Sequence, residues 1–164
     1  MATWQSYIDG MIVNEPMPDG SWLTNICQEA AIIQHDGSFL AQTPGFSLGT
    51  YEVTVMDKDE KPQTVTVNEK EILINLAFTG KATTKEAGIR INNTKFMLAK
   101  YDSDSKTAYL SKAQGGACVM ATATTIIFAS YNTSLKMSNG LGQNAGKCNL
   151  VVEKLAKMLL ANKF

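Results

Sequence analysis

The sequence predicts a single α+β domain over residues 1–164. We expect a central antiparallel sheet with N- and C-terminal helices on one face, a further helix on the other face, and a projecting β-hairpin. Three observations predict this fold. Apolar residues recur at helical spacing at both ends of the chain and in its middle. Two segments alternate apolar and polar residues around turns, and short strands with turns between them fill residues 89–131.

The first helix should begin after Thr3, whose hydroxyl can accept an unpaired backbone N–H. The apolar residues Trp4, Tyr7, Ile8 and Met11 then share one helical face. The stretch 16–20, with its prolines and glycine, should end regular structure. A short second segment is expected over 21–28.

Two hairpins follow. Residues 30–42 form the first, with a turn at His35-Asp36-Gly37 and His35 exposed. Residues 51–67 form the second, because valines alternate with polar residues on both sides of the charged tip 57–62. Polar residues at every second position predict that one face of this hairpin is exposed to solvent, so the hairpin should project from the body of the domain.

A middle helix should run from the cap Asn68 to Gly80. A polar loop is expected over 81–87. The strands that follow should pair antiparallel, with one turn at Gln114-Gly115-Gly116. The loop 132–147 precedes the last helix, whose apolar face is Cys148, Val151, Val152, Leu155, Met158 and Leu159.

Fifteen basic and fifteen acidic residues balance, which argues against a nucleic-acid partner. The balance hides a polarity: residues 1–80 hold eleven acids and three bases, and residues 81–164 hold twelve bases and four acids. The basic half would favour acidic protein surfaces or anionic lipid heads, unless the two halves interleave in space. Without a membrane-length apolar run or a signal peptide, and with three distant cysteines, the chain is expected to be cytoplasmic with reduced, buried thiols.

The residues favour binding over chemistry. The chain has one histidine and no cysteine pair at metal-ligand spacing, so we expect no enzyme activity, cofactor or metal. The glycines of segment 140–146 do not have the spacing of a phosphate-binding loop. A connecting loop is the better interpretation of this segment.

Two candidate binding surfaces remain. Trp4 and Tyr7 can form a shallow groove with the last helix, and aromatic grooves bind polyproline helices; simple core packing is the alternative. Lysines at 95, 100, 112 and 147 should come onto one side of the domain and suit an acidic partner; a solvated sheet face is the alternative. A layered domain of this size could instead be a small-molecule or phosphoinositide-head sensor, with Trp4 fully buried.

Four ordered motifs resemble the profilin family over nearly the whole chain. The segments are Trp4-Gln5-Ser6-Tyr7-Ile8-Asp9, then 27–37, then 112–117, and finally 148–155. The resemblance implies the fold described above and a cytoskeleton-associated regulator of actin assembly. Its partners would be monomeric actin, polyproline-rich proteins such as formins, and phosphoinositide lipids.

The resemblance also implies site residues. For actin they are Lys95, Lys100, Lys112, Gly115, Gly116, Lys147 and Asn149. For polyproline they are Trp4, Tyr7, Leu40, Leu155, Met158 and Leu159. The family usually has Trp at the position of Leu40, so the resemblance implies a weakened groove. The inserted hairpin at 48–67 is similar to the projecting hairpin of apicomplexan profilins, and we expect it to contact actin or tune its affinity.

Overall fold

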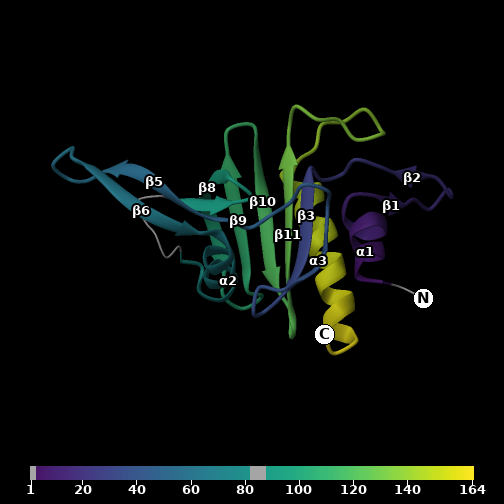
Figure 1. Ribbon diagram of the computed structural model, residues 1–164. Helices are drawn as coiled ribbons and strands as arrows, with labels where there is room; N and C mark the ends of the chain where they lie inside the picture. Colours follow the sequence, from purple (N-terminus) through teal and green to yellow (C-terminus); the bar gives the residue numbers. More distant parts are fainter. Residues whose placement is uncertain (1–2, 82–87) are drawn as a thin grey trace.

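The computed structural model describes residues 3–81 and 88–164 and is built around a seven-stranded antiparallel sheet (Figure 1). Its strands, in sheet order, are β4 (Phe39–Gln42), β3 (Glu29–Gln34), β11 (Thr125–Asn132), β10 (Gly115–Ala121), β9 (Thr107–Lys112), β8 (Thr94–Asp102) and β7 (Ile89–Ile91). Two further pairs lie outside it: β1 (Glu15–Pro16) with β2 (Trp22–Leu23), and β5 (Thr50–Met56) with β6 (Pro62–Asn68). The helices are α1 (Trp4–Tyr7), the π-helix η1 (Ile8–Ile12), α2 (Glu69–Thr79) and α3 (Ala145–Ala161).

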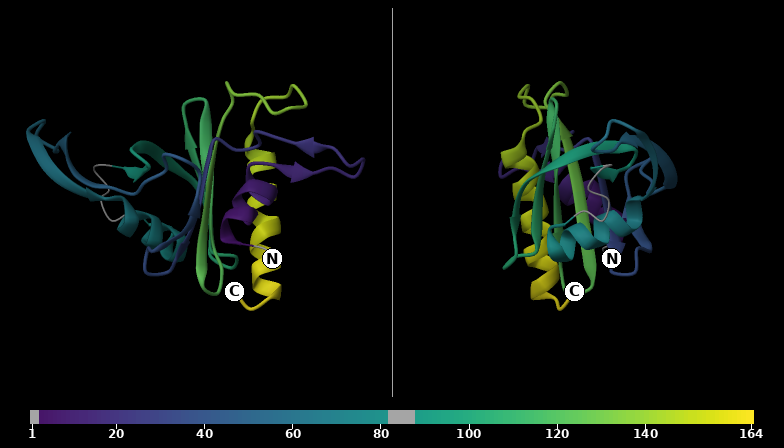
Figure 2. Two further views of the ribbon diagram at one scale, coloured as in Figure 1. Left: turned by 45° about the vertical axis from the view of Figure 1, so that its right-hand side comes forward. Right: turned by 90° about the vertical axis from the view of Figure 1, so that its left-hand side faces the viewer.

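The sheet separates two hydrophobic cores, as predicted. α1, η1 and α3 pack on one face and α2 on the other (Figure 2). Because side chains alternate across a strand, Cys118 joins the core under α3 and Val119 the core under α2. The central strands are therefore covered on both faces, which explains why β10 and β11 read as nearly continuous apolar runs.

The N-terminal helix begins as predicted but changes its winding. The Thr3 hydroxyl accepts from the Ser6 N–H at 3.1 Å, and the Ser6 hydroxyl accepts from the Thr3 N–H at 2.9 Å. After Tyr7 the chain continues as the π-helix η1, which buries Ile8 and Ile12 completely. The aromatic residues Trp4 and Tyr7, which belong to α1, are only half-buried.

The small β1–β2 hairpin was not predicted. The prolines and glycine of residues 16–20 predict irregular structure, yet Pro16 pairs with Trp22 across a turn. The Asp19 carboxylate closes this turn by accepting from the Ser21 N–H and hydroxyl, at 2.9 and 2.5 Å. Strands of only two residues carry no periodic signal, so pattern reasoning could not find them.

The β3–β4 and β5–β6 hairpins form as predicted, and β5–β6 projects from the α2 side of the molecule (Figure 2). His35 corrects one expectation, since it is half-buried rather than exposed. Its Nε2 lies 3.0 Å from the Thr122 carbonyl oxygen, and its ring packs edge-on against Phe78. The neighbouring β10–β11 turn and α2 thus cover a side chain that looked solvent-facing in sequence.

α2 has both predicted ends. The Asn68 side chain accepts from the Glu71 N–H at 3.1 Å, and Gly80 adopts the left-handed conformation with φ of 70°. Apart from Lys81, the predicted loop at 81–87 lies outside the described residues.

The strands from β7 to β11 pair in the predicted antiparallel succession, with one local correction. Gly115 and Gly116 begin β10 and do not form the turn. The turn is made by the two residues before them, where Gln114 has a φ of 57°, and Lys112 pairs directly with Gly115. α3 begins at Ala145, three residues earlier than expected, because the Asn144 side chain caps it by accepting from the Lys147 N–H.

Candidate functional site

An aromatic groove lies where α1 and the C-terminal end of α3 meet one end of the sheet. This end is formed by the last residue of β3, the start of β4 and the first residue of β11. The Trp4 ring contacts Tyr7 on one side and Phe164 on the other, with 5.7 Å between ring centroids in both pairs. Both pairs are edge-to-face, the arrangement that aromatic quadrupoles favour. The three rings therefore support one another at the surface of the domain.

Two adjacent hollows share Trp4 and Phe164. The smaller, of about 200 Å³, is also lined by Thr3, Tyr7 and Leu159. The larger, of about 380 Å³, is also lined by Gln34, Leu40, Thr124 and Thr125. The groove is thus a pair of apolar depressions with a polar rim.

The structure brings most of the predicted polyproline residues together here. Trp4, Tyr7, Leu40 and Leu159 line the two hollows. Leu155, in contrast, is fully buried in the core beneath them and Met158 is half-buried beside it, so Leu155 supports the groove from below. Phe39, the neighbour of Leu40, packs against Phe46 on the α2 side of the sheet and adds nothing to the groove.

Phe164 is the groove residue that sequence reasoning missed. Its main-chain oxygen accepts from the Thr124 N–H at 2.5 Å and from the hydroxyls of Thr122 and Thr124 at 2.9 and 3.0 Å. These bonds to the β10–β11 turn hold the ring against Trp4. The only sequence signal was an aromatic residue after the last apolar stripe, and no periodicity connects it with β10 or β11.

The groove also offers hydrogen-bond donors. Within the described part of the chain, the side chains of Trp4, Tyr7 and Gln34 have no hydrogen-bond partner. A polyproline II helix makes no internal hydrogen bonds, so its carbonyls need external donors. The arrangement can therefore bind an extended proline-rich segment by ring stacking and by donation to its backbone.

A second candidate surface lies on β8, at the other side of the sheet from β4. Lys95 and Met97 flank Phe96, whose ring is buried on the α2 side, so both point to the α3 side. Lys100 lies opposite Tyr109, which also faces α3. Since α3 packs on β10 and β11, this part of β8 stays uncovered and Met97 is 71% exposed.

Asn149 is half-buried on α3, one turn before Glu153. The Glu153 carboxylate accepts from the Tyr109 hydroxyl at 3.3 Å, so this flank of α3 faces β9. Lys95, Lys100 and Asn149 thus border one open surface.

The expectation that all four lysines lie on one side is wrong. Lys112 shares the α2 side of the sheet with Phe96, and its Nζ lies 5.9 Å from the centre of that ring. Lys147 forms an ion pair with Glu15 on the opposite flank of α3, where Lys154 lies 3.8 Å from the same carboxylate. Strand alternation separates Lys112 from Lys95, and helical rotation separates Lys147 from Asn149.

Gly115 and Gly116 have a packing role. A Cβ on Gly116 would lie 2.3 Å from the Leu110 carbonyl oxygen and 2.6 Å from the Tyr131 hydroxyl. A Cβ on Gly115 would lie 2.4 Å from the Tyr131 carbonyl oxygen. Only glycine lets β9, β10 and β11 approach this closely.

The three cysteines are free and buried, as predicted. Burial raises the pKa of the Cys118 thiol, and a hydrogen bond with Cys27, followed by burial, raises that of Cys148. Since the thiolate is the reactive form, Cys118 and Cys148 are core residues and not nucleophiles.

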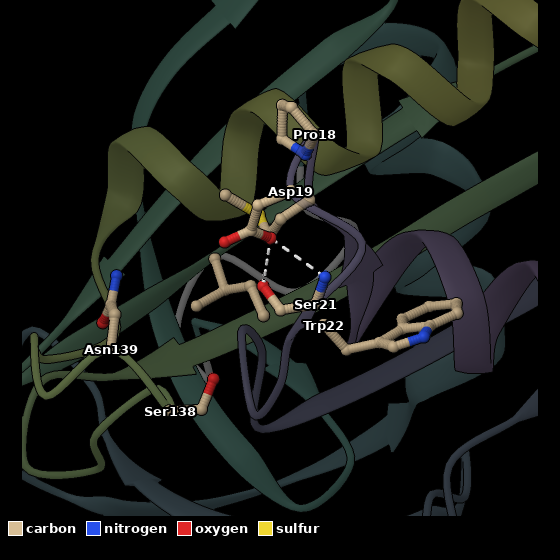
Figure 3. Close-up of a pocket in the computed structure, with 8 residues that line it drawn as sticks. Pro18, Asp19, Ser21, Trp22, Ser138 and Asn139 are labelled. Atoms are coloured by element: carbon tan, nitrogen blue, oxygen red, sulfur yellow. Dashed lines mark hydrogen bonds between the residues drawn. The ribbon is translucent and has the colours of Figure 1, made fainter.

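A third hollow, of about 420 Å³, lies between the β1–β2 hairpin and the loop before α3 (Figure 3). Trp22, 55% exposed, and Asp19 come from the hairpin, and Ser138 and Asn139 from the loop. It contains none of the predicted site residues. No helix among the described residues is long and apolar enough to cross a membrane.

Comparison with known proteins identifies the family. The profilin family model matches residues 2–164. The chain belongs to the profilin family. Profilin of Tetrahymena pyriformis is 32% identical over 162 residues, covering 97% of each chain.

Solved profilin structures share this fold. Profilin II of Acanthamoeba castellanii superimposes with a TM-score of 0.66 at 23% identity, covering 99% of this chain and 100% of that one. Mouse profilin IIa, in complex with a double repeat from the FH1 domain of mDia1, gives 0.57 at 20% identity with the same coverage. LokiProfilin2, in complex with rabbit actin, gives 0.50 at 16% identity, covering 83% of this chain and 86% of that one. Profilins are actin-binding proteins and not enzymes.

Proposed function

We propose that this protein binds monomeric actin in the cytoplasm, sequesters or delivers actin subunits, and thereby regulates filament assembly. The aromatic groove takes polyproline-rich partners such as formins. Membership of the profilin family supports the proposal, as do the actin and FH1 complexes of LokiProfilin2 and mouse profilin IIa. The observation that carries it is the separation of two open surfaces: the aromatic groove reaches β4 at one edge of the sheet, and four strands lie between β4 and the β8 surface. Both partners can therefore bind at once.

The β8 surface is the proposed actin contact. Met97 provides apolar area, and Lys95 and Lys100 provide positive charge next to it. An apolar centre with a charged rim is the usual composition of a protein interface, and the lysines would steer an acidic partner. Phosphoinositide headgroups are a further proposed ligand of the same lysines, and they would compete with actin.

A charge reversal tests this contact. Lys100→Glu should weaken the binding of monomeric actin by roughly tenfold, because it places like charges against an acidic partner. Lys81→Glu is the matched control, since Lys81 is exposed beyond α2 on the other side of the sheet. Affinity is measured by the delay of pyrene-actin polymerisation. Equal effects of the two substitutions would remove β8 from the interface.

The groove is tested with a proline decamer in a Trp22→Phe background, which leaves Trp4 as the only tryptophan. Binding of the decamer should change the Trp4 fluorescence. Tyr7→Ala should lower the affinity for the decamer. The sensor alternative required a fully buried Trp4, whereas Trp4 is half-buried and lines both hollows. An unchanged spectrum at millimolar peptide would contradict the groove.

The β5–β6 hairpin is proposed as an arm that contacts actin or tunes its affinity, similar to the projecting hairpin of apicomplexan profilins. Its base must be kept in any test, because Val67 is fully buried. Thr54 pairs with Thr64, so replacing residues 55–63 by Asn-Gly closes a shorter hairpin in the same register. Unchanged actin affinity of this folded variant would exclude the arm from the interface.

A further inference from the structure

A small polar hollow lies on the α2 side of the sheet, where β3, β9 and β11 meet the β7–β8 turn. Its volume is about 60 Å³, enough for only a few water molecules. The rings of Phe96 and Phe128, which pack edge-to-face with 6.3 Å between their centroids, form its apolar wall. The rest of the lining is mostly polar, so the hollow is not a packing gap of the hydrophobic core.

The Ser130 side chain is the feature that points to a ligand. Ser130 is 5% exposed, lines the hollow, and lies on the same face of β11 as Phe128. Its hydroxyl has no hydrogen-bond partner among the described residues, whereas the other buried polar side chains in that part of the chain all have one. Because an unpaired buried hydroxyl is costly, water or a ligand in the hollow must supply the partner.

Two opposite charges line the same hollow without pairing. The Lys112 chain passes over Gly115, where a Cβ would lie 3.0 Å from Lys112 Cε, and its Nζ lies 5.9 Å from the centre of the Phe96 ring. Oε2 of Glu29 accepts from the Thr43 hydroxyl at 3.3 Å, and Oε1 has no partner among the described residues. Neither Lys112 nor Glu29 forms an ion pair within the described chain. A bound molecule can therefore bridge the ammonium and the carboxylate.

We propose that this hollow binds a small α-amino acid, of the size of glycine or alanine. Lys112 Nζ and the Ser130 hydroxyl donate to the carboxylate of the ligand, and Glu29 accepts from its ammonium group. A simple anion would meet the Glu29 carboxylate and a simple cation the Lys112 ammonium, so a zwitterion is the ligand that satisfies both charges. The hollow is separate from the aromatic groove and from the β8 surface, so this inference does not depend on the proposed function.

A nuclear magnetic resonance titration of the ¹⁵N-labelled full chain with glycine tests the proposal. The backbone amide signals of Glu29, Gly115 and Ser130 should shift and saturate with a dissociation constant below about 1 mM, which is within reach of so small a ligand. Acetate and methylamine each carry one of the two charges of glycine. Each should bind at least about tenfold more weakly, because it loses one charge-assisted contact and leaves a like charge opposed.

Ser130→Ala is the sharpest variant. Its thermal unfolding should match that of the parent, since the hydroxyl has no protein partner to lose, while its affinity for glycine should fall about tenfold. Lys112→Met and Glu29→Gln should weaken glycine by at least about tenfold. Lys136→Met is the matched control for loss of a positive charge, since Lys136 is exposed in the loop before α3, and it should bind glycine as the parent does.

Three results would overturn the proposal. Shifts that grow linearly with glycine and never saturate would show that there is no site. Saturable binding that is equal in the parent and in all three hollow variants would place glycine elsewhere on the protein. Acetate binding as tight as glycine binding would show an anion site in which Glu29 takes no part.

Discussion

Tyr51 donates its phenolic hydrogen to Oε2 of Glu69 over 2.7 Å, and this bond fastens the base of the β5–β6 hairpin to the first residue of α2. The same carboxylate accepts from the Asn93 N–H at 2.7 Å and from the Gly49 N–H at 2.9 Å. Glu69 is only 1% exposed. One buried side chain therefore joins the hairpin, α2 and the β7–β8 turn, and sets the direction in which the proposed arm projects.

Replacing Glu69 by alanine should destabilise the fold by about 3 kcal/mol, because two main-chain N–H groups and a phenol lose their acceptor. Glu71→Ala is the matched control, since Glu71 lies in the same first turn but is exposed, and it should cost less than about 0.5 kcal/mol. Urea unfolding followed by circular dichroism measures both. Similar costs would show that Glu69 does not hold these segments together.

Alkaline pH should loosen the same contact. Burial, and next the hydrogen bond to Glu69, raise the pKa of Tyr51 from 10.0 to about 12. Between these values the unfolded chain has lost a proton that the folded chain retains, so stability is complete below pH 10 and falls as pH rises toward 12. Tyr51→Phe should lose less stability than the unmodified protein over this range. Because Tyr109 has a similarly raised pKa, mainly through burial, the difference between the two proteins is the quantity to measure.

Gly116→Ala should destabilise the protein by about 2–4 kcal/mol, since the new methyl group would overlap the Leu110 carbonyl oxygen. Gly10→Ala is the control. Its Cβ would meet only the Trp22 ring at 3.9 Å, an ordinary contact, so the change should be neutral or slightly stabilising. Thermal unfolding compares the two. A Gly116→Ala protein as stable as the parent would mean that these strands can separate at little cost.

Lys147→Ala should lower stability by about 1–3 kcal/mol and leave actin affinity unchanged. Lys147 pairs with Glu15, which is 8% exposed and would keep only the more distant Lys154. Lys157→Ala, on the same helix but exposed, should change stability little. Unfolding and pyrene-actin assays on both variants check this. Loss of actin affinity with intact stability would return Lys147 to the proposed interface.

Local signals located most elements correctly. The caps of Thr3, Asn68 and Gly80 act within four residues of themselves, and the apolar stripe of α3 needs only its own helix. The β1–β2 hairpin escaped detection because its strands are too short to show a period. Gly115 and Gly116 were assigned to a turn because glycine marks both turns and close strand approaches, and only the neighbouring strands distinguish these uses.

For the candidate sites, too, the sequence identified some residues and the structure was needed to place them. Sequence motifs selected Trp4, Tyr7 and the lysines, but they could not show that Lys112 faces α2 or that Phe164 completes the groove.

By itself, the sequence determined the α+β class, the order of the elements other than β1 and β2, and the family, because helical and strand periodicities, caps and short motifs are properties of neighbouring residues. Only the tertiary structure decided which side chains share a surface. Lys147 bonds Glu15, His35 is covered by Phe78, and the Phe164 oxygen is held by Thr122. Each of these contacts joins segments far apart in the chain, and their meeting depends on how the sheet and helices pack as a whole.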